Sequence, residues 1–419
     1  ASTAIAEAGT RCDTAIAHHL GPVIGAIAPV AGGGGFCNVG GPLCTDHSAQ
    51  PCAATGHRPA GRGMNDFLII GGGIAGISAA ARLSALGSVT VLEREDALAY
   101  HASGRSAALF EQHYGKASTV ALNRASLDFH RSADVLSPRG LMLVGSKGEA
   151  DLFAADVAAM QMAEITMDAA LAVIPVLNPA HVDRAAYDPG AWDIDTDRLI
   201  QTFAKTARGN GAQIVTKAEV TAISRTAQGW AVSTKAGDYA ARQLVNAAGA
   251  WVDVIAQMAG VAPLGFQPLR RSMARIPAPD GHDIRAWPMV FGAGEGWYAK
   301  PDAGALIVSP AEEDPVAPHD AYADDMVLAE GLARYEANVT TPVTRLLASW
   351  AGLRTFSSDR NLVLGPDPAH AGFIWCAGQG GYGMQSAPGA SQLLADLVGG
   401  KTPEISPDLV AALTPNRFR

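Results

Sequence analysis

Apolar and polar positions change their period along the chain, and each change marks an expected element. The short runs Phe67–Ile70 and Val89–Leu92 are mostly apolar, which is typical of buried strands. Between them, over Ile74–Leu86, apolar positions recur with a helical period. Glycines and Arg82 inside this stretch argue against a membrane-spanning helix, which needs about 20 evenly apolar residues. The pattern therefore predicts a buried strand–helix–strand unit and no transmembrane segment.

The chain after this unit is of mixed type. Residues 118–175 favour helix, with an apolar interruption at Leu141–Val144, and residues 262–345 alternate strand-like and polar stretches. The other expected elements are a helix at Asp195–Gly209, strands at Gln213–Val215, Val220–Arg225, Trp230–Thr234, Gln243–Asn246 and Phe373–Ala377, and a last helix near Ser386–Val398.

Residues 1–63 differ from the rest of the chain. They are rich in Ala, Gly, Pro and Thr and show no sustained helical or strand period. We expect them to form a mobile, low-complexity extension in front of Met64. The alternative is a metal or iron–sulfur site on Cys37, Cys44 and Cys52, but their spacing matches no ligand pattern, so no metal is predicted.

Composition and charge narrow the classes of function. The net charge of −9 and the pI near 5.6 argue against nucleic-acid binding, because phosphate contacts need clustered Lys and Arg. Five cysteines do not make a disulfide framework in a chain of 419 residues, so a reducing, cytoplasmic setting fits best. Cys376, in an apolar run, is expected to be an inert core thiol. The sequence leaves peripheral membrane association and the oligomeric state open.

A glycine motif marks the start of the first expected helix. Gly71, Gly73 and Gly76 stand in G-x-G-x-x-G register, which allows a tight turn, close approach of a pyrophosphate and close packing of helix on strand. Glu93, at the end of the second strand, stands where a carboxylate binds a ribose hydroxyl. These features agree on a dinucleotide site, but they do not distinguish NAD from FAD.

Two later segments favour FAD. Leu244–Trp251 is predicted to be a strand ending in small residues, which lets the adenosine half of a cofactor pass closely. Cys376–Met384 is a glycine turn before the last helix, and a helix N-terminus placed there would stabilise negative charge on a reduced flavin ring. Three separated segments around one extended ligand indicate FAD rather than NAD.

Several motifs carry a family resemblance. They are His101–Ala108, Tyr187–Asp197, Leu244–Trp251, Gln267–Ser272, Trp297–Asp302, Trp350–Phe356 and Gln379–Gly383. On these motifs the chain resembles the D-amino-acid oxidase/dehydrogenase family of FAD-dependent oxidoreductases, and within it bacterial FAD-dependent D-arginine dehydrogenase. The resemblance runs from Met64 to about Val398. It implies an α/β fold in which a doubly wound, Rossmann-like FAD domain is interleaved with an α+β substrate domain built on a mixed sheet.

The resemblance implies discontinuous domains. Residues 64–110, 190–260 and 345–400 are expected to form the FAD-binding domain, residues 111–189 and 261–344 the substrate-binding domain, and residues 401–419 a C-terminal tail. The residues expected to bind FAD non-covalently are Gly71, Gly73, Ile74, Ala75, Gly76, Glu93, Arg94, Ser103, Arg105, Ser106, Ala107, Val220, Ala248, Gly249, Trp251, Gly380, Gly381, Tyr382, Gly383, Met384 and Gln385.

The same resemblance places Arg354 and Tyr298 at the carboxylate of the substrate. An arginine presents a planar fork of donors that matches a carboxylate, and a tyrosine hydroxyl adds another donor. Tyr114 and Arg271 match further active-site positions that face the substrate. For Tyr114 the alternative is core packing with a satisfied hydroxyl, and for Arg271 it is replacement by its neighbour Arg270.

Three positions depart from D-arginine dehydrogenase around the substrate side chain. Leu141 stands where that enzyme has the glutamate that pairs with the substrate guanidinium, and Leu109 replaces a histidine. A cation buried without its carboxylate loses a contact of roughly 2–5 kcal/mol, so Leu141 favours an apolar side chain. Glu111, in place of a threonine, is able to restore selectivity for a cation from another direction.

We therefore expect FAD-dependent oxidative deamination of a D-amino acid with an apolar or broad range of side chains. Hydride would pass from Cα to flavin N5, and the imine would hydrolyse to a 2-oxo acid and ammonia. The electron acceptor is expected to be a quinone or another acceptor rather than oxygen, although oxidase activity stays open. The alternatives are oxidation of a secondary amine, such as an opine or sarcosine, and a non-catalytic flavin electron-transfer subunit.

Overall fold

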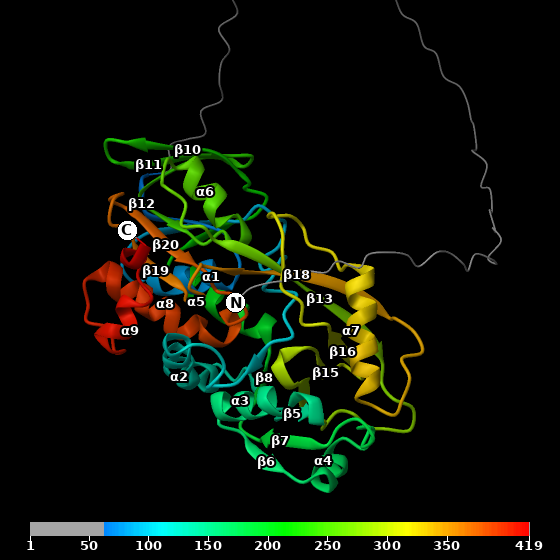
Figure 1. Ribbon diagram of the computed structural model, residues 1–419. Coiled ribbons are helices and arrows are strands. Elements are labelled where there is room, and N and C mark those ends of the chain that lie inside the picture. Colours follow the sequence, from blue (N-terminus) through cyan, green and yellow to red (C-terminus); the bar gives the residue numbers. More distant parts are fainter. Residues whose placement is uncertain (1–62, 419) are drawn as a thin grey trace, which may run out of the picture. The chain divides into compact units, whose positions relative to one another are not determined.

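The computed structural model describes residues 63–418, which belong to one compact unit. The expected extension 1–63 thus lies outside the described residues, except for Gly63. In the described part the strands form sheets of eight, nine and three strands (Figure 1). The α/β architecture predicted from the sequence is confirmed.

The eight-stranded sheet contains the predicted strand–helix–strand unit. β1 (Asn65–Ile70) lies between β2 (Val89–Leu92) and β12 (Gly237–Asn246) and is parallel to both. The other strands are β9 (Gln213–Val215) and β20 (Phe373–Ala377), which are parallel to their neighbours β2 and β12, and the antiparallel β10 (Val220–Thr226), β11 (Gly229–Thr234) and β19 (Val363–Pro366). The loops after β1, β2, β12 and β20 meet at one edge because the carboxyl ends of parallel strands share it.

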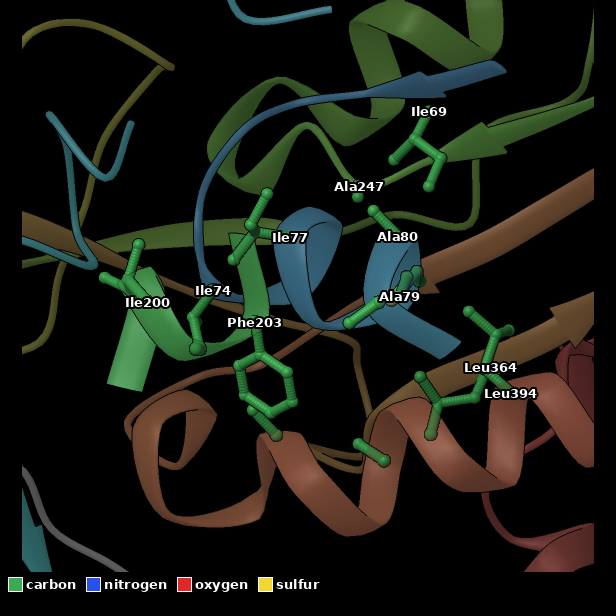
Figure 2. Packing of buried hydrophobic residues seen from close by; sticks show 14 of the residues in the cluster. Ile69, Ile74, Ile77, Ala79, Ala80, Ile200, Phe203, Ala247, Leu364 and Leu394 are labelled. Atoms are coloured by element: carbon green, nitrogen blue, oxygen red, sulfur yellow. The ribbon is translucent and has the colours of Figure 1, made fainter. Parts of the chain in front are cut away.

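Helices cover both faces of this sheet. α1 (Ile74–Leu83), α5 (Thr196–Gly209) and α8 (Gly383–Gly399) share one buried cluster, in which Ile77, Phe203 and Leu394 gather (Figure 2). The short α6 (Val252–Met258) packs into the cluster on the opposite face. The sheet is therefore doubly wound, as expected. α1 ends three residues before the expected Leu86, because the turn into β2 begins at Ser84.

The nine-stranded sheet runs in the order β17-β13-β16-β15-β14-β5-β7-β6, with β18 on the free side of part of β13. All its pairs are antiparallel except β14 with β5. The strands are β5 (Leu141–Gly145), β6 (Ala163–Ile165), β7 (Arg184–Asp188), β13 (Gln267–Pro277), β14 (Met289–Gly292), β15 (Tyr298–Asp302), β16 (Ala305–Ser309), β17 (Asp314–Pro315) and β18 (Ala348–Phe356).

Side chains alternate between the two faces of this sheet. Met142, Ala274 and Val308 belong to a cluster that also includes residues of α4 (Met167–Val173) and α7 (Asp325–Ala337). Leu141, Met273, Phe291 and Tyr298 belong to a different cluster, which includes Phe153 of α3 (Ala150–Met160). The second cluster borders the candidate active site described below, so the period of two in these strands determines which side chains reach it.

Three elements are placed differently from the expected segments. β18, inside residues 345–400, pairs with β13 along its whole length and so joins the nine-stranded sheet. α2 (Ala117–Ser132), inside residues 111–189, packs on α8 beside the eight-stranded sheet. The small third sheet joins β3 (Leu109–Phe110), β8 (Trp192–Ile194) and β4 (Leu136–Pro138). Short connections link strands of different sheets, and the local residue pattern does not indicate which sheet each strand joins.

Two helical regions lie where strands or a tail were expected. α7 lies in a stretch where alternating strands were predicted, and Asp324 caps it by accepting hydrogen bonds from the N–H groups of Met326 and Val327. Residues 401–419, expected to be a tail, contain α9 (Pro407–Ala411) and bury Leu413 completely in the cluster around α8. No helix within residues 63–418 has both the length and the apolar character that a membrane span requires.

Candidate active site

Three cavities form one continuous channel at the carboxyl edge of the eight-stranded sheet. The first, of about 300 Å³, lies between Gly71, Glu93 and Trp251. The second, of about 130 Å³, shares Gly73, Ser103 and Gly352 with the first. The third, of about 100 Å³, shares further wall residues with the second and opens toward the nine-stranded sheet. These shared residues are Ser106, Ala107, Arg271, Arg354, Gly381 and Met384.

The glycine motif has the geometry that a pyrophosphate requires. Gly71 adopts φ = 107°, and a Cβ on it would stand 2.3 Å from the carbonyl oxygen of Ala247. A Cβ on Gly76 would meet the oxygen of Gly71 itself, so only glycine lets α1 pack this closely on the turn after β1. Ser103 Oγ accepts a hydrogen bond of 2.9 Å from the N–H of Ile74, which fixes the first turn of α1 against the loop after residue 100.

The outer end of the channel is built around Glu93. One carboxylate oxygen accepts a 2.7 Å hydrogen bond from the N–H of Gly72, and the other accepts one of 2.8 Å from Glu95. Each oxygen keeps a lone pair for a ribose hydroxyl. Trp251 forms the facing wall, and the Arg94 guanidinium lies 4.9 Å from the centre of its ring. This end suits the adenosine half of a dinucleotide.

The structure brings most of the predicted cofactor residues to this channel. The lining includes Gly71, Gly73, Ile74, Ala75, Glu93, Arg94, Ser103, Arg105, Ser106, Ala107, Val220, Ala248, Gly249, Trp251, Gly380, Gly381, Gly383, Met384 and Gln385. Gly76 and Tyr382 are the two predicted residues that line none of the three cavities. The ring of Tyr382 packs between Tyr114 and Phe356 instead, so its contribution is to the core beneath the site.

Arg105 lines the channel, but its side-chain N–H groups donate hydrogen bonds to other parts of the protein. It donates to the carbonyl oxygens of Tyr100, Ala321 and Ala351 and to the carboxylate of Asp320. Its guanidinium therefore braces the loop of residues 100–108 against the segment near Asp320 and against β18. The resemblance indicated the place of Arg105 along the cofactor, but its hydrogen bonds depend on distant segments that no local pattern reveals.

The antiparallel register of β13 and β18 places two arginines on the same face of the sheet. Arg271 stands opposite Gly352, and Arg354 stands two residues further along the same strand, opposite Leu269. Diagonal neighbours of this kind lie within reach of long side chains. Both guanidinium groups line the third cavity and the second. Arg270 points away and pairs with Asp314, so of the two neighbouring arginines it is Arg271 that reaches the cavity.

Tyr114 and Tyr298 join the arginines in the third cavity. The hydroxyl of Tyr114 donates to Glu295 at 3.2 Å, and that of Tyr298 contacts the sulfur of Met273 at 3.2 Å. Burial, followed by the charge of Glu295, raises the pKa of Tyr114 above its ordinary value and keeps its hydroxyl protonated. The phenol of Tyr114 is therefore a hydrogen-bond donor at neutral pH.

The two arginines remain cationic although Arg271 is buried and Arg354 half-buried. Burial and then the charge of Arg354 lower the pKa of Arg271, whose Nε donates to the carbonyl oxygen of Glu312 at 2.9 Å. Burial also lowers the pKa of Arg354, but nearby tyrosines and Glu295 outweigh it, and the pKa lies above its ordinary value. Two guanidinium groups facing one cavity create a strong preference for an anion there.

The third cavity is also lined by Leu109, Glu111 and Leu141, the residues predicted to contact the substrate side chain. Sequence reasoning did not find Glu295 or the apolar residues Met160, Met289, Phe291 and Trp297, which also line this cavity. Glu295 lies in a short 3-10 turn and adopts φ = 55°, a backbone conformation that a side-chain-bearing residue seldom takes. That unusual conformation follows from tertiary packing and leaves no mark in the residue pattern.

Comparison with known proteins agrees with this site. A family model described as FAD dependent oxidoreductase matches residues 66–397. The chain belongs to this family. Its cofactor is FAD, and the glycine turns, the small channel walls and Glu93 fit that group. The residues that would hold FAD lie in the first and second cavities, because these are continuous with the glycine motif.

Two relatives and one solved structure illustrate the similarity. Glycine oxidase of Pseudomonas putida is 26% identical over 364 residues, covering 81% of this chain and 96% of that protein. N-methyl-L-tryptophan oxidase of Salmonella dublin is 27% identical over 222 residues, which cover 49% of this chain and 57% of that protein. The crystal structure of glycine oxidase from Geobacillus kaustophilus gives a TM-score of 0.72 at 23% identity, over 84% of this chain and 98% of that chain. None of the three is named as a D-arginine dehydrogenase, so that finer resemblance stays a prediction.

Proposed function

We propose that this flavoprotein oxidises the Cα–N bond of a free D-amino acid to an imine, which water converts to a 2-oxo acid and ammonia. The side chain of the substrate is drawn from a broad range rather than restricted to arginine. FAD bound in the channel supplies the hydride acceptor for this reaction. The observation that carries the proposal is the convergence of four side chains on the third cavity, which shares wall residues with the second. These side chains are Arg271, Arg354, Tyr114 and Tyr298.

These four side chains bind and orient the substrate. The guanidinium of Arg354 offers paired donors to the carboxylate, and Arg271 and the two phenols offer further charge and donors. Held by its carboxylate, the substrate has its Cα directed toward the wall of Gly381 and Met384, which both cavities share. The first turn of α8 begins there, and its positive end favours negative charge in the adjoining channel.

The amine must lose its proton before hydride can leave Cα. Tyr114 stays protonated and the two arginines stay cationic, so none of these three groups takes that proton. We therefore assign the proton to solvent, and the rate is expected to rise with pH through one apparent pKa of the bound substrate.

Substitution of Arg354 tests the carboxylate assignment. Arg354→Ala should lower kcat/KM for the best D-amino acid by about 100-fold or more, because a charge-assisted, bidentate contact is lost. Arg285→Ala is the matched control, since Arg285 is exposed and pairs with Asp283. The measurement is anaerobic bleaching of the flavin across D-, L- and N-substituted amino acids. A change below twofold in Arg354→Ala would show that the carboxylate binds elsewhere.

A second candidate function is oxidation of a secondary amine. It is favoured by the similarity to a protein named N-methyl-L-tryptophan oxidase. The same panel separates the two, because a secondary-amine enzyme would be bleached faster by an N-methyl amino acid than by the primary amino acid of the same side chain. Bleaching by L-amino acids alone would overturn the proposed D-configuration.

We also propose a quinone or another acceptor, rather than oxygen, as the oxidant of the reduced enzyme. Stopped-flow mixing of the reduced enzyme with air-saturated buffer and, separately, with a soluble quinone measures both rates. The proposal requires that the quinone reaction be the faster one.

A further inference from the structure

Two buried polar atoms at the far wall of the third cavity have no partner within residues 63–418. They are Oε2 of Glu111 and Nε2 of Gln385. Both residues line the cavity, and each is only 3% exposed to solvent. A buried acceptor or donor without a partner costs about 1–3 kcal/mol, so such atoms are uncommon and call for an explanation. A ligand that donates a hydrogen bond to Oε2 of Glu111 explains the unpaired acceptor.

The remaining contacts of the pair fix which atoms stay free. The backbone N–H of Glu111 donates to Oε1 of Gln385 at 3.1 Å, so the amide oxygen of Gln385 must face it. Its amide nitrogen is then left as a free donor. Oε1 of Glu111 accepts from the N–H of His113 at 2.9 Å. The other carboxylate oxygen of Glu111 is left as a free acceptor.

The carboxylate of Glu111 lies toward β5 and β7, away from the strand that carries Arg271. The charged neighbour that acts on Glu111 is Asp188, which stands directly opposite Leu141 in the pairing of β7 with β5. Between β5 and β13, the strand of Arg271, lie β14, β15 and β16. Four strand spacings of about 4.8 Å separate the two backbones by roughly 19 Å. The cavity thus has a cationic end and an acidic end, with Leu141 and Phe291 among the apolar residues of its wall.

We propose that the carboxylate of Glu111, positioned by Gln385, forms a second polar subsite that binds a cationic group at the far end of the substrate side chain. The proposal rests on the proposed function and names its preferred substrate class, an amino acid with an aliphatic side chain that ends in an ammonium or guanidinium. The apolar wall between the two ends covers the methylene groups. Glu111 supplies the charge, and Gln385 holds the backbone of Glu111.

The electrostatic surroundings of Glu111 agree with this role. Burial, joined by the charge of Asp188, raises the pKa of Glu111 to about 7, although the N–H groups of His113 and Tyr114 act in the opposite direction. The imidazole Nδ1 of His113 lies 3.2 Å from the same carboxylate. A bound cation would favour the ionised carboxylate and replace the missing partner of Oε2.

The sharpest test uses ligands that carry no α-amine. The holoenzyme is titrated with γ-aminobutyrate, δ-aminovalerate and ε-aminocaproate and with butyrate, valerate and caproate, and binding is followed by the absorbance of the flavin. At one chain length or more, the ω-amino acid should bind about tenfold or more tightly than the matched fatty acid. Glu111→Gln should remove this preference and leave the affinity for the fatty acid within about threefold.

Glu164→Gln is the matched control, because it removes the same charge from an exposed position on β6. It should keep the preference of the wild-type protein. If the fatty acid binds at least as tightly as its ω-amino counterpart at every length, the subsite does not bind a cation. The same conclusion follows if Glu111→Gln keeps the preference.

A second arm relates the subsite to turnover. D-lysine should be oxidised with a kcat/KM about tenfold or more above that of D-norleucine, and Glu111→Gln should equalise the two. If neither amino acid bleaches the flavin, the proposed oxidation fails, and the binding titrations still decide the subsite. If D-norleucine is the better substrate in the wild-type enzyme, the subsite proposal fails and the proposed oxidation stands.

Discussion

At the scale of single residues, Glu111 links the active site to the stability of the fold. Its pKa in the folded protein is about 7, above the ordinary value of 4.5. Between these two pH values the folded state binds more protons than the unfolded state, so the free energy of unfolding falls as pH rises through this window. Below pH 4.5 the carboxyl is neutral in both states, and above pH 7 it is charged in both.

The difference in free energy of unfolding between Glu111→Gln and the wild-type protein should therefore be more favourable to the variant at and above pH 7 than at pH 4.5. The gain is on the order of 3 kcal/mol, from about 1.4 kcal/mol for each unit of pKa difference. Thermal unfolding of the wild-type and variant holoenzymes between pH 4.5 and 8 measures it, with Glu164→Gln as the control. A difference in Tm that stays constant with pH would contradict the raised pKa.

Sequence reasoning found some residues of the site and missed others for a physical reason. Arg354 and Tyr298 stand in motifs whose residue types match the carboxylate of an amino acid. Gln385 was assigned to the cofactor, yet it also lines the third cavity and holds Glu111. Glu295 was missed, because its place beside Tyr114 results from a turn that other segments hold. Tyr114 and Glu295 are 181 positions apart in sequence and meet only after folding.

At the scale of elements, α2 and α8 are joined by an exchange of hydrogen bonds. Pro388 lies inside α8 and has no N–H to donate. One residue later, the N–H of Gly389 donates to Ser126 Oγ at 2.9 Å. His130 Nε2 donates to the carbonyl oxygen of Gln385 at 2.9 Å, and burial lowers the pKa of His130 to about 4, so it stays neutral. α2 thus fixes the start of α8, which lines the active site.

Gly389→Ala should weaken this helix pair. A Cβ at this position would stand 2.7 Å from the carbonyl oxygen of Leu122, a backbone atom that cannot move alone. The expected loss is about 1–3 kcal/mol, the usual effect of overpacking. Gly399→Ala is the matched control at the end of the same helix, where the nearest atom would be a leucine methyl at 3.4 Å. Equal melting temperatures for the two variants would show that α2 and α8 are not closely packed at Gly389.

Elements with a strong local pattern were predicted well, and those without one were not. β2, β9 and β20 have the predicted limits, because short apolar runs between turns specify buried strands. α7 was missed because few of its residues are buried, namely Leu328, Gly331 and Tyr335, and the apolar stripe is weak. The pairing of β18 with β13 was not predictable either, since sheet partners distant in sequence depend on the whole fold.

At the scale of the whole molecule, the cofactor channel connects the two large sheets. Its walls come from the loops after β1, β2 and β12 and also from Gly352 and Leu353 of β18, a strand of the nine-stranded sheet. A ligand in the channel is therefore contacted by both sheets. Binding of such a ligand to the folded protein alone stabilises both together.

FAD should raise the melting temperature of the apoprotein in proportion to the logarithm of its concentration. At an FAD concentration of about 100 times Kd, the free energy of unfolding rises by roughly 2.7 kcal/mol. Gly71→Ala should abolish the gain, because its φ is positive and its new Cβ would meet the oxygen of Ala247. Thermal melts of both apoproteins with increasing FAD measure this. An unchanged gain in Gly71→Ala would place the cofactor outside the described channel.

The pairing of β13 with β18 separates the proposed carboxylate-binding residues from those proposed to contact the substrate side chain. Protein engineers often need to change these two properties independently. Arg271 and Arg354 depend on the register of one strand pair, so an insertion or deletion of a single residue there would turn one of them to the opposite face. The residues proposed to surround the substrate side chain, Leu109, Glu111 and Leu141, come from other strands and loops. Libraries confined to these three positions can therefore search for new substrate preferences while the arginines proposed to bind the carboxylate keep their places.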